Sequence, residues 1–275
     1  MLKKLYSTIK YFSRKMSAHK ISAYSAEGAF YIILSIFPFL IMLLSLVRFL
    51  PFQESELLNF AKGVLPAAVD ELFTNFIKDL SNTNDAVTII SALTLLWSSS
   101  KGVYSVIGGL NSVFEERETR SYFKVRFLAV IYTLSFMLTI LLTFILLVLG
   151  NSITEFVDSK YPNLSALAFF AMSFRFLIGF CMLIIFFISI YKFLACGKRR
   201  FADQLPGAMI ASVGWIAYSV LFAFYIDNFS NYAPLYGSLT AVILLMLWLY
   251  SCMYILFLGA EINLYYIRKI AVKNK

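Results

Sequence analysis

The sequence predicts an all-α membrane protein, a polytopic bundle of six transmembrane helices with both termini in the cytoplasm. Of its 275 residues 60% are hydrophobic and only 14% are charged, against roughly 45–50% and about 25% in soluble domains. The mean hydropathy of +0.79 means more apolar surface than one globular core can hide. In addition, six apolar stretches reach the roughly 20 residues that a helix needs to cross a bilayer.

The six predicted spans lie within a single membrane domain, residues 1–275. They cover about residues 29–50, 86–107, 127–149, 170–194, 206–226 and 238–260. None shows the polar and apolar alternation of a strand, and a helix satisfies its own backbone groups in hydrocarbon. In the fourth span the apolar run already begins at Leu164, which leaves the depth of Arg175 in the membrane open.

Lysine and arginine predict the orientation, because cytoplasmic segments of membrane proteins retain these residues. Residues 1–26 contain six basic residues and no acidic one, whereas the loop 51–85 contains six acidic residues and two lysines. We therefore expect the N-terminus inside and the loop outside. Two further loops are predicted inside because they are basic: the second loop contains Arg117, Arg120, Lys124 and Arg126, and the fourth contains Lys192, Lys198, Arg199 and Arg200. The tail 261–275 is predicted inside by Arg268, Lys269, Lys273 and Lys275. The net charge of +9 is then mainly an orientation signal, and we expect no nucleic-acid partner.

Two segments outside the spans have the apolar spacing of surface helices. In residues 1–26, Leu2, Leu5, Ile9, Phe12 and Met16 recur at helical intervals among lysines and arginines. This pattern predicts an amphipathic helix on the anionic lipids of the inner leaflet, or a charged face that only fixes topology. In the outer loop a second amphipathic helix is predicted by Val69, Leu72, Phe73, Phe76, Ile77 and Leu80.

Pro38 is the first candidate for a substrate pathway. It lies near the middle of the first span and cannot donate a hydrogen bond to the carbonyl of Leu34, so a kinked or broken helix is expected. Transporters use such interruptions to expose backbone groups to a substrate. Neighbouring helices accommodate many other membrane prolines without any such role.

Ionisable residues at the spans are the next candidates, because charges in a bilayer are costly unless paired, hydrated or within reach of the interface. Glu27, Lys101 and Glu261 fall toward the cytoplasmic ends, where Lys101 could pair with either carboxylate or extend to the interface. Arg48 and Arg175 lie toward the outer half, where two cations would attract an anionic group.

Small residues and tryptophans indicate how the helices pack. In the fifth span Gly207, Ala211 and Gly214 share one face, which permits close helix contact. That face could join helices within one chain or between two chains of a homo-oligomer. The tryptophans lie in mid-span, where we expect them to pack against neighbouring helices: Trp97, Trp215 and Trp248.

The usual signatures of catalysis and of metal binding are missing from the sequence. His19 is the single histidine, and the three cysteines are far apart in or near apolar runs. There is no zinc spacing, no phosphate-binding Gly-Lys loop and no His-Glu-x-x-His pair. We therefore expect no enzyme activity, no cofactor and no metal site.

Several short motifs resemble the YihY/BrkB family of bacterial inner-membrane proteins, whose members were formerly labelled ribonuclease BN. The match extends over nearly the whole chain, in this order: Ser35-Ile36-Phe37-Pro38, Leu96-Trp97-Ser98, Lys101-Gly102, Leu110-Asn111, Leu205-Pro206-Gly207-Ala208, Tyr225 to Asn228, Tyr236-Gly237-Ser238-Leu239, Leu247-Trp248-Leu249-Tyr250, and Leu258-Gly259-Ala260-Glu261 with Asn263. The resemblance implies a six-helix inner-membrane protein that is described as a transporter or a virulence-associated factor.

The leading hypothesis is a permease for an anionic or amphipathic substrate, including a lipid. It is motivated by Pro38, the charged residues and the polar motif residues Asn111, Tyr236, Gly237, Glu261 and Asn263. The rival is a membrane scaffold that transports nothing and binds lipids or envelope proteins. We reject ribonuclease activity, because metal-dependent cleavage needs clustered histidine or carboxylate ligands. Cleavage of tRNA by the pure protein, lost on chelation, would overturn that rejection.

Overall fold

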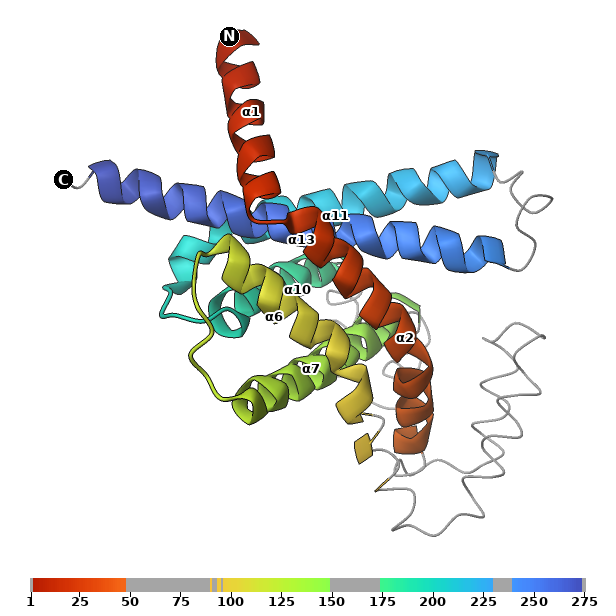
Figure 1. The fold of residues 1–275 in the computed structure, drawn as a ribbon. Coiled ribbons are helices and arrows are strands. Elements are labelled where there is room, and N and C mark those ends of the chain that lie inside the picture. Colours follow the sequence, from red (N-terminus) through yellow and green to blue (C-terminus); the bar gives the residue numbers. More distant parts are fainter. Residues whose placement is uncertain are drawn as a thin grey trace, which may run out of the picture. The chain divides into compact units, whose positions relative to one another are not determined.

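The computed structural model describes residues 2–47, 90, 93–94, 96–148, 174–229 and 239–273, and every regular element in these ranges is a helix (Figure 1). The all-α class is therefore confirmed. The chain forms two compact units, one made of Met1–Phe30 with Gly102–Lys275 and the other of Tyr31–Lys101. The first unit contains most of the described residues and is called the main unit below.

The described helices follow one another along the chain with short connections between several of them. They are α1 (Leu2–Ala18), α2 (Ile21–Val47), α6 (Lys101–Val113), α7 (Tyr122–Val148), α10 (Arg175–Ser189) with its π-helical continuation η2 (Ile190–Leu194), α11 (Phe201–Phe229) and α13 (Leu239–Lys273).

Among the described residues, three helical stretches are long and apolar enough to cross a membrane. They are Phe176–Leu194, Phe201–Ile226 and Val242–Ile270, and they coincide with the fourth, fifth and sixth predicted spans. Helices α2 and α7 have 27 residues each, or about 40 Å at 1.5 Å per residue, which exceeds a hydrocarbon core of about 30 Å. The second predicted span is described only in part, and α6 continues to Val113, beyond the predicted end of that span.

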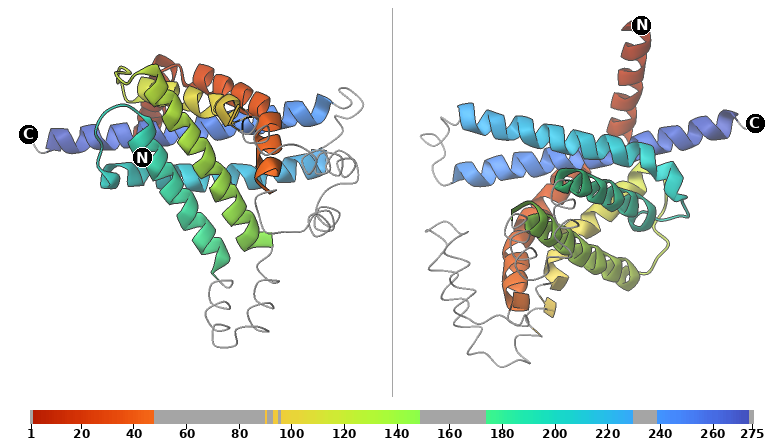
Figure 2. Two further views of the ribbon diagram at one scale, coloured as in Figure 1. Left: turned by 90° about the horizontal axis from the view of Figure 1, so that it is seen from below. Right: turned by 180° about the vertical axis from the view of Figure 1, so that it is seen from behind.

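Helices α11 and α13 form an antiparallel pair that runs side by side in both views of Figure 2. A side chain at Gly207 would meet the carbonyl of Gly259, and a side chain at Gly214 would lie 3.2 Å from Ile255. Farther along, the Trp248 indole donates a hydrogen bond to the Ser219 hydroxyl over 3.2 Å. The small face of Gly207, Ala211 and Gly214 therefore joins two helices of the same chain.

Helix α10 packs between α11 and α7 in the main unit (Figure 2). The Phe187 ring lies 5.6 Å from that of Trp215, which meets Trp248 edge to face at 5.9 Å. On the other side of α10, the Tyr132 hydroxyl donates to the carbonyl of Ser189 over 2.9 Å. The expected packing of Trp215 and Trp248 is thus confirmed, whereas Trp97, in the second unit, is 43% exposed.

Two expectations about the first half of the chain can be compared with the structure. The prediction for Pro38 was a kinked or broken helix; the backbone of α2 stays helical past Pro38 as far as Val47, so the helix is not broken there, and the kink stays a prediction. Residues Leu2–Ala18 form helix α1, and its amphipathic role on lipid stays a prediction. Arg48, the predicted outer helix, Tyr236 and Gly237 lie outside the described residues.

Candidate functional site

The segment between α6 and α7, residues 114–121, organises the polar contacts of the main unit. Helix α6 ends with two backbone hydrogen bonds, from Glu116 to the carbonyl of Asn111 (2.9 Å) and from Glu115 to that of Ser112 (3.2 Å). This is the Schellman arrangement, whose left-handed residue is usually glycine. Here that residue is Glu115, with φ of 57°. A side chain is thus kept where the local backbone disfavours one.

The Glu115 carboxylate explains why a side chain is kept there, since it binds three cationic or donor groups from other elements. Lys15 Nζ lies 3.1 Å away, Arg268 Nη2 2.6 Å and His19 Nε2 3.2 Å. The hydrogen bond from Lys15, followed by the contacts of Arg268 and His19, lowers the pKa of Glu115 to about 2 against the opposing effect of burial. One loop carboxylate thereby joins α1 and α13 to the end of α6.

His19, which contacts this carboxylate, lies in the turn between α1 and α2. The turn is closed by Lys20, whose φ of 53° is left-handed, and the backbone carbonyl of His19 accepts a 2.9 Å hydrogen bond from Ser112. His19 Nδ1 is hydrogen-bonded to Oε1 of Glu261 on α13. Only 8% of His19 and 2% of Glu261 remain exposed. The ring therefore bridges two carboxylates from different parts of the main unit.

This pairing corrects the sequence prediction for Glu261. The sequence allowed Lys101 to pair with Glu27 or Glu261 or to extend to the interface, but the carboxylate of Glu261 binds His19, which lies in the predicted cytoplasmic segment 1–26. Glu27 and Lys101 are both exposed. No spacing rule relates residues 242 positions apart, so the only usable signal was that both positions are ionisable and belong to cytoplasmic ends.

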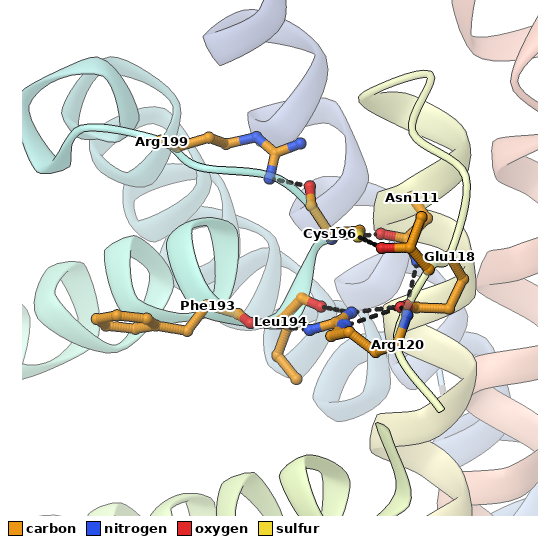
Figure 3. Close-up of polar contacts among 8 residues, drawn as sticks. Asn111, Glu118, Arg120, Phe193, Leu194, Cys196 and Arg199 are labelled. Carbon is orange, nitrogen blue, oxygen red and sulfur yellow. Dashed lines mark hydrogen bonds and ion pairs between the residues drawn. The ribbon is translucent and has the colours of Figure 1, made fainter. Parts of the chain in front are cut away.

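A second cluster joins the same segment to the residues that follow η2 (Figure 3). Asn111 donates to Glu118 over 2.8 Å and accepts a 2.6 Å hydrogen bond from the backbone of Cys196. Arg120 holds Glu118 through two parallel hydrogen bonds of 2.7 Å each. The side-chain hydrogen bond from Arg120 is the main reason that the pKa of Glu118 falls to about 2. Asn111, proposed as a pathway residue, thus holds two loops together in this structure.

The guanidinium groups of this cluster satisfy carbonyls at the end of the π-helical segment. Arg120 donates to the carbonyls of Leu194 (2.8 Å) and Phe193 (3.4 Å), which the helix itself leaves without intrahelical partners. Arg199 donates to the carbonyl of Cys196 over 2.6 Å and lies 3.9 Å above the ring of Phe114. These contacts fix the connection into α11.

Asn263 has a comparable role between α13 and α11. Its side-chain oxygen accepts a 2.7 Å hydrogen bond from the backbone of Gly207, and its amide donates to Gln204 over 3.3 Å. Like Asn111, this candidate therefore connects elements within the main unit.

The remaining candidates do not join these clusters within the described residues. Arg175 is the first residue of α10, and neither its side chain nor that of Pro38 is described. In the described ranges no group of three or more histidine, cysteine or carboxylate side chains could hold a metal ion. What the structure does bring together is the α1–α2 turn, residues 114–121, the residues after η2 and one end of α13. The lysine and arginine pattern assigns these segments to the cytoplasmic side.

The carboxylates of both clusters predict how stability responds to acid. Glu115 and Glu118 have pKa values of about 2 against a usual value of 4.5. Their contribution to the free energy of unfolding is complete above pH ~4.5 and is lost as the pH falls toward 2. In a pH series of melting temperatures in detergent, we expect a decline across this window. Glu118→Gln should flatten it, and equal declines in wild type and variant would contradict the assignment.

The sequence of this chain is similar to those of several known proteins. The family described as Virulence factor BrkB matches residues 12–275. The ribonuclease-like protein YfkH of Bacillus subtilis is 32% identical over 262 residues, which cover 94% of each chain. The membrane protein VV0203 of the UPF0761 group, from Vibrio vulnificus, is 26% identical over 93% of this chain and 80% of its own. No solved structure matches.

Proposed function

This chain belongs to the BrkB family of membrane proteins, and from that membership we propose that it is a multi-pass permease of the bacterial cytoplasmic (inner) membrane. Its proposed substrate is anionic or amphipathic, with a lipid included. Three helices long and apolar enough to span a bilayer support the membrane setting. Helices α7, α10 and α11 each contact the next described helix in chain order, up to α13, as neighbouring spans of a bundle would.

The observation that carries the proposal is the contact between His19 and Glu261. Glu261 is 2% exposed on α13, a helix otherwise apolar enough to cross the bilayer. Ionisable residues in such helices are rare, and by default they indicate a pathway for substrate or ion. A buried pair at one end of a span is expected in a permease and is not needed for a passive membrane anchor.

A membrane scaffold is the second candidate, and the polar motif residues favour it. Asn111 and Asn263 each bind groups from another element with both ends of the amide. Amides used in this way connect elements of the fold, which is the role expected of them in a scaffold. Partners of either candidate are proposed to include anionic inner-leaflet lipids. The name of the Bacillus subtilis relative refers to ribonuclease, but we propose no enzymatic activity for this chain.

Lipid translocation in reconstituted vesicles separates the two candidates. The pure protein is placed in vesicles that contain fluorescent phosphatidylglycerol, and dithionite added outside bleaches only the outer leaflet. A permease should expose inner-leaflet probe, so that bleaching proceeds beyond the half expected of protein-free vesicles. Fluorescent phosphatidylcholine is the matched probe without net charge. Bleaching that stops at half with both probes would favour the scaffold.

The proposed role of the two outer arginines gives a prediction within the same assay. Arg48→Ala and Arg175→Ala should each slow the movement of the anionic probe, because they remove the cations proposed to attract its headgroup. Movement of the uncharged probe should change less. If both variants leave every measured flux unchanged, the anion role of these residues is wrong.

A further inference from the structure

The ring of His19 lies between two carboxylates, and its hydrogen-bonding capacity limits how both contacts can form. Nδ1 is bonded to Oε1 of Glu261, and Nε2 lies 3.2 Å from Oε1 of Glu115. An ionised carboxylate can only accept hydrogen bonds, and a neutral imidazole has a single N–H to donate. A neutral ring between two ionised carboxylates would therefore set one nitrogen lone pair against an oxygen lone pair. Both contacts need one more proton than that state contains.

The charges around the ring indicate which carboxylate shares this proton. Lys15 from α1 and Arg268 from α13 both contact Glu115, at 3.1 and 2.6 Å. The negative charge of Glu115 is thus balanced by two cations, and 45% of the Glu115 side chain is exposed to solvent. Glu261 is 2% exposed and bonds to His19. A buried carboxylate without a compensating charge or proton is strongly disfavoured, so the additional proton belongs to the contact between His19 and Glu261.

We propose that His19 and Glu261 form a proton-binding site that holds one exchangeable proton. The pair exists either as imidazolium and carboxylate or as neutral imidazole and carboxylic acid. When the proton leaves to solvent, the remaining N–H can serve Glu115 or Glu261 but not both. Deprotonation therefore breaks one of the two contacts that the His19 ring makes, either with α13 or with the segment after α6. The site stands on its own geometry, whether or not the protein transports a substrate.

The test uses the fact that His19 is the only histidine in the chain. Full-length protein grown with ¹⁵N-histidine and placed in lipid nanodiscs gives NMR signals from the two nitrogens of one ring. At neutral pH, proton coupling shows which nitrogens carry a proton, and difference infrared spectra show whether a buried carboxyl group is protonated. Two results agree with the site: both nitrogens protonated, or Nδ1 bare together with a protonated carboxyl band.

Substitutions assign the proton to the pair. Glu261→Gln keeps the shape of the side chain but can donate to Nδ1, so the ring should keep one proton, on Nε2, and any carboxyl band should disappear. Glu116→Gln is the matched control, because Glu116 is adjacent to Glu115 and contacts Arg199 at 3.5 Å. It should leave both signals as in wild type.

One wild-type result overturns the proposal, and it does not depend on whether any variant folds. A ring with only one protonated nitrogen, whether Nδ1 or Nε2, combined with no protonated carboxyl band at neutral pH, would show that the additional proton is absent. Identical ring protonation in wild type and Glu261→Gln, again without a carboxyl band, would also overturn it. If Glu261→Gln does not fold, Glu261→Asp replaces it. The shorter side chain retains the carboxylate but should weaken the hydrogen bond at Nδ1.

Discussion

Gly207→Val is expected to drive α11 and α13 apart and to lower the free energy of unfolding by several kcal/mol. A side chain at this position would meet the carbonyl oxygen of Gly259 and the amide of Asn263. Forcing extra carbons into a packed interface costs about 1–3 kcal/mol. Loss of the 2.7 Å hydrogen bond from Gly207 to Asn263 would add about 1–3 kcal/mol if that buried amide stays unsatisfied.

Thermal unfolding in detergent, followed by tryptophan fluorescence, measures this effect, because Trp215 and Trp248 meet across the same pair of helices. Gly179→Ala is the matched control. Gly179 also lies in an apolar helix, α10, but no atom of the described residues, apart from its chain neighbours and the nearby backbone of α10, is within 4 Å of the position that its side chain would take. The control should melt at the wild-type temperature or slightly above it, since alanine favours a helix. Equal melting temperatures for Gly207→Val and wild type would contradict the close contact.

The second large effect is expected for Arg120→Ala. This change removes both hydrogen bonds to Glu118 and leaves the carbonyls of Phe193 and Leu194 without their guanidinium donor. Hydrogen bonds to charged groups contribute about 1.5–3 kcal/mol each. The residues after η2 should therefore open more often. Hydrogen–deuterium exchange of residues 193–200 should become at least about tenfold faster, because 1.4 kcal/mol corresponds to a factor of ten.

Two further variants separate the geometry of Arg120 from its charge. Arg120→Lys keeps the charge but lacks the planar fork that binds a carboxylate with two donors, so its exchange should lie between wild type and Arg120→Ala. Arg117→Ala removes an exposed arginine of the same segment and should leave exchange unchanged. Exchange that rises equally in Arg117→Ala and Arg120→Ala would show that overall charge, and not the described contacts, controls the loop.

The second half of the fold was predictable because the bilayer requirement acts on each helix separately. Length and hydropathy place the fourth to sixth spans over most of Phe176–Leu194, Phe201–Ile226 and Val242–Ile270, although the last of these continues ten residues beyond the predicted end at residue 260. Small residues at helical spacing likewise identify the face that carries Gly207 and Ala211, both of which are buried against α13. Periodicity and composition are local signals, and both the membrane spans and the small-residue face of α11 are determined by local sequence.

The polar site was predictable only in part, because its contacts join residues that are remote in the sequence. Glu261 and Asn263 attracted attention as polar residues near an apolar run, but their partners at His19 and Gly207 follow from how helices meet. The importance of Glu115 was missed for a different reason. Its left-handed backbone is typical of glycine, so the sequence gives no local sign that α6 ends in this geometry.

The dense bonding of residues 114–121 has a practical consequence for mapping topology. A loop accepts an inserted reporter domain when its backbone and side chains are free of tertiary contacts. This segment instead binds α1, α13 and the residues after η2 through Glu115, Glu118 and Arg120. A reporter domain inserted here would disrupt these contacts, so it would report the side of the membrane on which an unfolded product lies. Single cysteines for impermeant labelling, placed at exposed Lys124 or Lys198, would report on the intact protein.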